Sequence, residues 1–334
     1  MTEPTNWPDR GEILRTAAGF RAACVLGAAA ELELFDLIGG QSLSAEQVAG
    51  KLDCDLRATE MLLDALAALR LLQKSGNLYS VPDELQPLLS ADGPQTALPM
   101  VHHSMNILRN WSQLAWVVKA GIPPPRTASV RGFDADRAAF IGAMHAVSQP
   151  VADELVRRIP PPPFKHLLDV GGASGTWTVA FLRAAPGSRA TIFDLPEAIQ
   201  QARARLTGTE WADRVTLAAG DFYRDELPAG ADFAWVSAIA HQHSRQHNRE
   251  LFAKVFRALE PGGWIALRDV VMDASRTRPA DGALFAINML VNTASGGTFT
   301  FEEFADDLRA AGFVEPELRV QSEDMNSVVV ARRP

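Results

Sequence analysis

Long apolar runs are absent from this chain of 334 residues. The stretches that come nearest, such as Ala283–Val291, fall well short of the about 20 residues that a membrane-spanning helix needs. The first ten residues include Glu3, Asp9 and two prolines, and they lack the basic segment and apolar core of a signal peptide. We therefore expect a soluble protein that works in the cytoplasm.

Cysteine is scarce as well, since the chain has only Cys24 and Cys54. Both lie in segments of helical character, and neither belongs to a Cys-x-x-Cys motif or to the Cys and His spacing of a zinc site. The two residues are predicted to be buried free thiols, as is usual in a reducing compartment.

Basic residues are fewer than acidic ones. The chain has 32 Lys and Arg against 40 Asp and Glu, a formal net charge of −8. This balance argues against general binding to nucleic acid phosphates or to anionic membranes. The remaining composition, with 47% hydrophobic and 22% charged residues, is ordinary for a globular protein, and the length favours two domains.

Helical sequence dominates the first half of the chain. Residues 11–38 are rich in Ala, Leu and Phe, and apolar side chains such as Ile13, Leu14, Ala17 and Phe20 recur at helical spacing on more than one face. A helix with so little polar surface needs a partner besides its own domain. The segment therefore predicts the interface of a homodimer.

The next segment has the outline of a winged helix. Ser44 begins a capping box that opens a short helix, Ala45–Leu52, and Asp55 caps a second helix that runs to about Leu72. Residues 74–81 then supply a turn between two short strands. Two helices followed by a hairpin are typical of this motif.

A winged helix can also bind DNA, usually through the second helix of the motif. Residues 56–72 carry only Arg57 and Arg70 as basic side chains, alongside Glu60 and Asp64. A helix that follows DNA phosphates would be richer in Lys and Arg. We therefore interpret the motif as a packing or dimerisation unit, with DNA binding as the alternative.

Prolines mark the predicted boundary between the two domains. Helical sequence resumes from about Pro99 to Ile159, and the run Pro160–Pro163 cannot continue a helix. We expect a helical domain at residues 1–100, linking helices at 101–163 and an α/β domain at 164–334.

Short apolar runs alternate with helical stretches or loops after the prolines. These runs are His166–Val170, Ala190–Phe193, Val215–Ala218, Phe233–Ile239 and Trp264–Val271. The alternation predicts a parallel sheet that is covered by helices on both faces. Glu315–Val320 and Ser327–Ala331 are also strand-like, and the short connection between them predicts an antiparallel pair at the sheet edge.

A glycine-rich turn follows the first predicted strand. Asp169 is followed by Gly171, Gly172 and Gly175. These residues lie at the carboxyl end of the strand, where ligands of such folds bind. Glycines let the backbone approach a ligand without a clash at Cβ. The spacing fits neither the G-x-G-x-x-G of nicotinamide cofactors nor a P-loop. An acid two positions before the turn suits a cofactor that has a charged amino-acid tail and no phosphates.

Two more acids stand at the ends of the next two strands. Asp194 is placed to accept both hydroxyls of a ribose. Asp221 can bind an adenine amino group, while Phe222 flanks the base. Any one acid could be an ordinary helix cap. Three acids at successive strand ends, together with the glycine turn, indicate a nucleoside cofactor without phosphates, and S-adenosylmethionine fits.

The chain resembles the two-domain small-molecule O-methyltransferases of plant phenylpropanoid and bacterial natural-product pathways. The segments that carry this resemblance are Leu168–Gly175, Phe193–Pro196, Gly220–Phe222, Leu259–Gly263 and Ala311–Phe313. It implies a Rossmann-like methyltransferase sheet with an antiparallel C-terminal strand pair, preceded by a mainly helical winged-helix dimerisation domain. Ala173 departs from the family, which usually has glycine there.

The resemblance also implies a cofactor and the residues that hold it. The cofactor is S-adenosylmethionine, and the product is S-adenosylhomocysteine. The matching cofactor-binding positions are Asp169, Gly171, Gly172, Gly175, Asp194, Leu195, Asp221, Phe222 and Ser237.

A catalytic pair is implied by the same resemblance. Methyl transfer to a hydroxyl needs alignment of the two groups and removal of a proton. The family uses a histidine after the fourth strand, oriented by an acid after the fifth, and these positions hold His241 and Asp269. Histidine is mostly neutral at pH 7, as a base must be.

The catalytic segment departs from the family at two places. The usual His-Asp-Trp is here His241, Gln242 and His243, and a second acid near Gly296–Gly297 is replaced by Thr298 or Phe299. These departures leave room for methylation of carbon or nitrogen, where base catalysis matters less.

The same segment has three histidines, a residue type that often binds metal ions. His241, His243 and His247 lie close in sequence, but no Asp or Glu at ligand spacing completes a site. We expect no metal.

The acceptor pocket is expected to be apolar with a few polar contacts. By family position its residues are Trp111, Phe140, Met144, Phe285, Met289 and Asn292. This set favours a small, flat aromatic or polycyclic acceptor. The alternatives are a carbon or nitrogen methyltransferase of the same fold, and a non-catalytic regulator that binds a ligand or DNA.

Overall fold

The computed structural model describes residues 7–159 and 163–334, so most of the predicted Pro160–Pro163 boundary lies outside the described residues. The chain divides into two compact units. The first extends to Leu108 and includes Thr127–Ala146, and the second comprises Arg109–Arg126 and Val147–Pro334. The segment predicted to link two domains, residues 101–163, is thus shared between both units.

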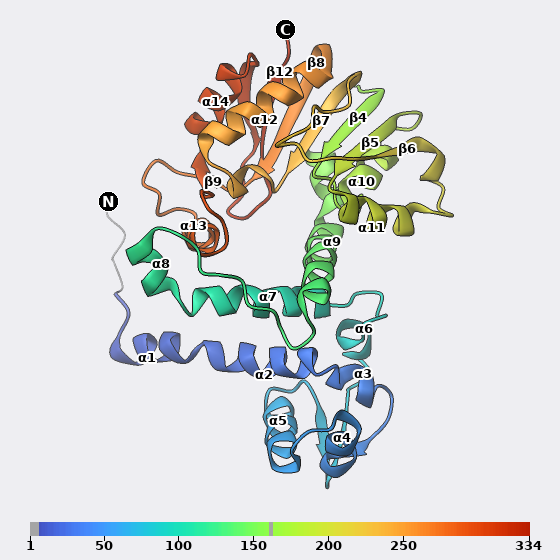
Figure 1. Cartoon of the computed structure of the whole chain (residues 1–334), viewed down its shortest axis with the longest axis vertical. Coiled ribbons are helices and arrows are strands. Elements are labelled where there is room, and N and C mark those ends of the chain that lie inside the picture. Colours follow the sequence, from blue (N-terminus) through green and yellow to red (C-terminus); the bar gives the residue numbers. More distant parts are fainter. Residues whose placement is uncertain (1–6, 160–162) are drawn as a thin grey trace. The chain divides into compact units, whose positions relative to one another are not determined.

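The first unit is mainly helical (Figure 1). Its elements, of which the last two continue into the second unit, are α1 (Arg10–Ala18), α2 (Phe20–Glu31), α3 (Leu34–Ile38), β1 (Leu43–Ser44), α4 (Ala45–Leu52), α5 (Leu56–Ala68), β2 (Gln73–Ser75), β3 (Leu78–Ser80), α6 (Gln86–Leu89), α7 (Leu98–Trp111) and α9 (Phe133–Arg158).

The predicted capping box and hairpin are confirmed in this unit. The amide of Gln47 donates to Ser44 Oγ at 3.3 Å, and the Gln47 side chain accepts from the Ser44 amide at 2.8 Å. Strands β2 and β3 pair antiparallel, and β1 adds on the other side of β3. One apolar core contains Leu63 and Leu66 of α5 together with Tyr79 of β3.

The helix predicted over residues 11–38 is divided into three. Gly19 separates α1 from α2, and Glu33 before α3 has a φ of +55°. Against the expectation from the sequence, an 18-residue window within residues 10–31 has a mean hydropathy of 1.3, so this segment is long and apolar enough to cross a membrane, although length and composition alone are weak support. Ile13, Leu14 and Phe20 are each more than half exposed. One chain therefore leaves much of this apolar surface uncovered.

The cysteine prediction was wrong in one respect. Both thiols are free, but Cys24 is exposed and Cys54 is only partly buried. Cys24 lies on α2, where only Gly27, Ala29 and Ala30 are buried. Its apolar surroundings in the sequence belong to the uncovered surface of α2 and not to the core.

The second unit contains a sheet of seven strands, visible in Figure 1. Its strands and helices, besides those already given, are α8 (Leu114–Ala120), β4 (His166–Val170), α10 (Thr176–Ala184), β5 (Arg189–Asp194), α11 (Pro196–Leu206), β6 (Val215–Ala219), β7 (Ala231–Ser237), α12 (Arg245–Ala258), β8 (Leu259–Asp269), β9 (Val271–Met272), α13 (Ala280–Asn292), β10 (Phe299–Thr300), α14 (Phe301–Ala310), β11 (Val314–Val320) and β12 (Ser327–Arg332).

The strand order is β11-β12-β8-β7-β4-β5-β6. Strands β4 to β8 are parallel to one another, while β12 is antiparallel to both β8 and β11. The predicted parallel sheet with an antiparallel C-terminal pair is therefore confirmed. A separate short pair joins β9 to β10, in parallel.

Both faces of this sheet are buried, because alternate residues of one strand belong to different cores. On β7, Ala234 and Val236 pack with Phe252 and Phe304 of α12 and α14, as part of one core. Phe233 and Trp235 pack instead with residues of α10 and of the end of α9. Two-sided burial explains why these strands are continuous apolar runs in the sequence.

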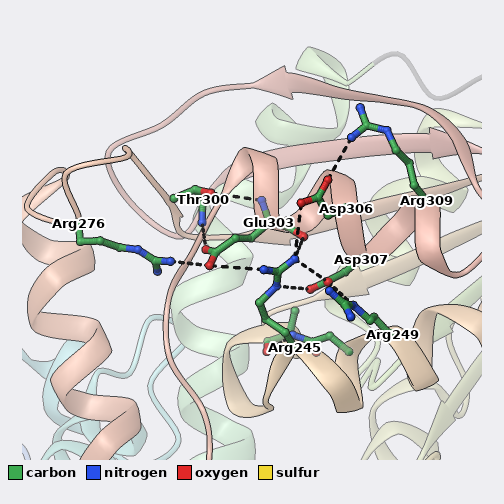
Figure 2. Close-up of polar contacts among 10 residues, drawn as sticks. Arg245, Arg249, Arg276, Thr300, Glu303, Asp306, Asp307 and Arg309 are labelled. Atoms are coloured by element: carbon green, nitrogen blue, oxygen red, sulfur yellow. Dashed lines mark hydrogen bonds and ion pairs between the residues drawn. The ribbon is translucent and has the colours of Figure 1, made fainter.

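Ion pairs join α12 to α14, two helices that pack on the same face of the sheet (Figure 2). Asp307 is buried, and its carboxylate accepts from Arg245 and Arg249 at 2.9 and 2.6 Å. Glu303 lies on the same helix and accepts from Arg276 at 2.5 Å. Arg276 belongs to the loop before α13, so the network also holds that loop.

Replacing Asp307 by alanine is expected to lower the free energy of unfolding by about 2 kcal/mol, because it leaves two arginines without their buried partner. The matched control is Asp306→Ala on the same helix, where the carboxylate is exposed and the loss is expected to stay below about 1 kcal/mol. Urea denaturation of both variants measures the difference. Equal losses would mean that the buried ion pairs do not stabilise the fold.

Candidate active site

The glycine-rich turn is built over a buried carboxyl group. Asp169, the penultimate residue of β4, has 1% of its surface exposed, and Thr178 Oγ1 donates to its Oδ2 at 2.5 Å. Burial raises the pKa of Asp169 to about 7. A Cβ at Gly172 would lie 2.7 Å from the Asp169 carboxyl carbon, so the backbone can cross above this group only as glycine.

Asp194, at the end of β5, stands beside the same turn. Its Oδ2 accepts from the Ala173 amide and its Oδ1 from the Leu195 amide, each at 2.7 Å. Burial raises the pKa of Asp194 above its ordinary value. A carboxylate offers about four lone-pair positions, so two remain for hydroxyl donors of a ligand. Leu195 itself is half exposed and available to a ligand.

Ala173 holds a backbone conformation that favours glycine, with a φ of +44°. Ala173→Gly is expected to raise the free energy of unfolding by about 0.5–1 kcal/mol, because an L side chain in this region costs more than the added chain entropy of glycine. Thermal unfolding measures the gain. Gly171→Ala is the opposite control, since φ is +68° there and a Cβ would lie 2.5 Å from the Ile239 side chain. A loss of stability in Ala173→Gly would contradict the assignment of strain.

The segment after β6 contains the predicted adenine residues. Asp221 Oδ1 accepts from the Tyr223 amide at 2.9 Å, and the Asp221 amide donates to Asp225 Oδ2 at 2.8 Å. The Phe222 ring is partly buried, 5.0 Å from the ring of Tyr223 and 5.6 Å from that of His243. Phe222 therefore belongs to an aromatic cluster that connects this segment with the one after β7.

Tyr223 and His243 form a contact that the sequence did not predict. The Tyr223 hydroxyl is hydrogen-bonded to His243 Nδ1, and the two rings meet edge to face at 5.0 Å. His243 is buried, and burial, with the nearby His241 and His247, lowers its pKa to about 4. The only sign of this contact in the sequence is that His243 stands where the family usually has tryptophan.

The predicted catalytic residues meet in a buried pair. His241 Nδ1 lies 2.8 Å from Asp269 Oδ1, and the His241 amide donates to Asp269 Oδ2 at 3.1 Å. The carboxylate thus holds both the ring and the backbone of His241. With Nδ1 as the donor to Asp269, the lone pair stands at Nε2, which is the tautomer of a general base.

Ser237, at the end of β7, is held by a buried arginine. Arg268 Nη1 donates to Ser237 Oγ at 3.1 Å, and its other nitrogens donate to Asn326 Oδ1. The guanidinium lies 4.6 Å from the Trp177 ring centre, and burial lowers its pKa to about 10. Sequence reasoning missed Arg268, because an arginine beside Asp269 has no distinguishing pattern.

Four of the predicted acceptor residues lie in the second unit. The Phe285 ring meets His241 edge to face, with centres 4.8 Å apart. Trp111 Nε1 donates to Asn288 Oδ1 at 2.9 Å, and Asn292 Oδ1 accepts from Asn110 at 2.8 Å. Met289, also on α13, is buried. The two asparagines Asn110 and Asn288 were not predicted, and they make this group more polar than expected.

The other two acceptor candidates, Phe140 and Met144, lie on the part of α9 that belongs to the first unit. Phe140 is 41% exposed, and its ring meets that of His103 at 5.1 Å. Met144 is partly buried. Their place in the acceptor pocket stays a prediction.

Two buried groups give the stability of the fold opposite pH dependences. The pKa of Asp169 is about 7 in the folded protein, against an ordinary value of 3.8. The folded state therefore binds more protons between these values, and the free energy of unfolding falls as pH rises through this window. His243 takes a proton at about pH 4 when folded and ordinarily at 6.5, so its contribution rises with pH between these values.

Single substitutions are expected to separate these two contributions. In Asp169→Asn the free energy of unfolding should rise more steeply between about pH 4.5 and 6.5 than in the unchanged protein. In His243→Asn it should rise less steeply or fall. Urea titrations across this range measure both slopes, and a shift of the same sign in both variants would refute the assignment.

Known proteins are similar to this chain over nearly its whole length. A family model described as the O-methyltransferase domain matches residues 107–314, and one described as the O-methyltransferase dimerisation domain matches residues 14–83. TcmO of Streptomyces glaucescens, a "tetracenomycin polyketide synthesis 8-O-methyl transferase", is 29% identical over 100% of both chains. Acetylserotonin O-methyltransferase of Gallus gallus is 28% identical over 95% of each. The solved structure of PigF with SAH superposes with a TM-score of 0.86 at 26% identity, and the match covers 97% of this chain and 100% of that one.

Proposed function

Since the chain belongs to the O-methyltransferase family, we propose that His241 is the general base of its methyl transfer and that Asp269 orients it. The observation that carries this proposal is the buried His241–Asp269 pair, in which His241 follows β7 and Asp269 ends the neighbouring strand β8. The acceptor is a hydroxyl group of a small aromatic or polycyclic molecule. Relatives named for a polyketide and for acetylserotonin support this class.

The cofactor of this family is S-adenosylmethionine, and the residues beside the glycine turn fit it. The free lone pairs of Asp194 suit the two hydroxyls of a ribose, and the turn at Gly171–Gly175 gives the backbone close approach to the amino-acid tail. Asp221 and Phe222 provide a carboxylate and an aromatic ring for the adenine. Leu195 and Ser237 complete the set. When bound, the cofactor supplies a methyl group on a sulfonium, which leaves as a neutral thioether.

The protein's own part in the reaction is alignment and proton removal. His241 Nε2 takes the proton of the acceptor hydroxyl as the new oxygen–carbon bond forms and the carbon–sulfur bond breaks. The ring then carries a positive charge, which the Asp269 carboxylate stabilises at Nδ1. Phe285 contacts the ring and keeps water from it. We propose that Trp111, Met289 and Asn292, all in the second unit, line the acceptor side.

The partner of this chain is proposed to be a second copy that covers α1 and α2. The match to a dimerisation domain spans most of these helices, which carry the exposed Leu14 and Phe20. The net charge of −8 and the poorly basic α5 support a protein without nucleic acid or membrane partners. Its two free thiols support a reducing compartment, which we propose to be the cytoplasm. Light scattering of the purified protein should give twice the mass of one chain.

Calorimetric titration with S-adenosylmethionine and S-adenosylhomocysteine, with NADH as the control ligand, tests the cofactor. One site per chain is expected for each adenosyl ligand and none for NADH. Phenolic and polycyclic acceptors are then screened, and fragmentation of the product by mass spectrometry locates the methyl group. A methyl group on carbon or nitrogen would overturn the hydroxyl acceptor, and failure to bind either adenosyl ligand would overturn the assigned site.

A further inference from the structure

The loop that follows α13 contacts the backbone of His241. The Gly297 amide donates to the His241 carbonyl at 2.9 Å. A Cβ at Gly296 would lie 2.5 Å from that carbonyl oxygen, 2.5 Å from Thr293 Oγ1 and 3.0 Å from the carbonyl carbon of Gln242. Real Cβ atoms do not approach backbone atoms so closely, so any side chain at Gly296 must push the two segments apart.

The loop is itself fixed to the end of α13 by one hydroxyl. Thr293 Oγ1 donates to the Met289 carbonyl at 2.7 Å and accepts from the Gly296 amide at 2.9 Å. The hydroxyl therefore sets the position of Gly296 relative to the last turn of the helix. A side chain without this hydroxyl would leave the Gly296 amide without this acceptor.

The rest of the His241 segment is held just as closely. Asn248 of α12 donates to the Ala240 carbonyl at 3.0 Å, and Asp269 accepts from the His241 amide. The contact with Gly297 completes this set of anchors on residues 240 and 241. Of the three, it alone comes from the loop that directly follows α13, the helix that carries the acceptor candidates Phe285, Met289 and Asn292.

We infer that Thr293 and Gly296 are positioning residues that, through the backbone contact made by the Gly297 amide, fix His241 relative to an acceptor bound on α13. The inference rests on the proposed role of His241 as the base. Proton transfer requires a heavy-atom separation of about 2.6–3.2 Å, so a shift of the His241 backbone moves Nε2 out of reach. A misplacement of about 1 Å can cost about 10²-fold in rate.

Two neighbouring glycines provide a matched pair of variants. Gly296→Ala places a methyl group against the His241 carbonyl, whereas the described residues leave open space around a Cβ at Gly297, whose amide an alanine retains. We expect kcat to fall about 10²-fold in Gly296→Ala and less than about 3-fold in Gly297→Ala. The Kd of S-adenosylhomocysteine should stay unchanged in both.

Thr293 provides a second test that adds no bulk to the loop. Thr293→Val removes the hydroxyl and is expected to lower kcat about 10-fold, while Thr293→Ser retains it and should restore at least half of the activity. The pair keeps the inference testable if Gly296→Ala does not fold.

A spectroscopic readout separates this inference from the proposed base. The proton between His241 Nδ1 and Asp269 should give a far-downfield ¹H resonance that is absent in His241→Ala. We expect Gly296→Ala to shift or broaden it and Gly297→Ala to leave it in place. Full activity of His241→Ala would refute the base but not the positioning, which the resonance still reports. Identical kcat and resonance in the two glycine variants would overturn the inference.

Discussion

His241→Ala is expected to lower kcat by about 10³-fold while the Kd of S-adenosylhomocysteine changes less than about 3-fold. The reason is the geometry of the buried pair, in which Asp269 fixes Nδ1 and leaves Nε2 as the only basic atom of the ring. Removing the ring removes proton transfer but none of the proposed cofactor contacts. Steady-state kinetics with an accepted phenol and calorimetry measure the two quantities separately.

His247→Ala is the control for this variant, because His247 is an exposed histidine on α12. It should keep the kcat of the unchanged protein. Asp269→Asn should approach the loss in His241→Ala, since an amide that donates to Nδ1 leaves the proton on Nε2, the wrong tautomer for a base. Full turnover in His241→Ala would remove His241 from the reaction, though not the chain from its family.

Asp194→Ala is expected to weaken the binding of S-adenosylhomocysteine by about 10²-fold or more. Two hydrogen bonds from the ribose to a charged acceptor contribute about 1.5–3 kcal/mol each, and 1.4 kcal/mol corresponds to a factor of ten. The substitution also leaves the amides of Ala173 and Leu195 without their acceptor. Calorimetry measures the Kd.

Asp194→Asn should have a Kd for S-adenosylhomocysteine between those of the unchanged protein and Asp194→Ala, because asparagine keeps a carbonyl oxygen but loses the charge. Asp213→Ala, which removes an exposed acid of the same unit, is the control and should bind normally. An unchanged Kd in Asp194→Ala would mean that the ribose is held elsewhere. The proposed matching of Asp169, Asp194 and Asp221 to the parts of the cofactor would then be wrong.

The sheet could be predicted closely because its strands are buried on both faces. β4 begins and ends at the predicted residues, and the antiparallel C-terminal pair lies at the predicted edge. The first helix was less predictable. Periodicity describes which residues are apolar, but a break at Glu33, with its positive φ, follows from packing that periodicity does not contain.

In the candidate site, too, some residues could be predicted from the sequence and others could not. Residues such as Asp169 and Asp194 follow directly from strand ends, and the topology brings strand ends together. The contacts of Tyr223 with His243 and of Gly296 with the His241 carbonyl join segments that are distant in sequence. Neither segment alone contains a pattern that identifies its partner, so such contacts require the fold.

The chain has only two tyrosines, and they differ sharply in accessibility. Tyr79 is 1% exposed in the core of the first unit, where its hydroxyl donates to Asp64 at 2.6 Å. Tyr223 is 56% exposed and follows the proposed adenine residues directly. A reagent that nitrates phenols therefore modifies Tyr223 first. The protein thus has a single natural labelling position beside its cofactor segment, where a chromophore can report ligand binding without any engineered residue.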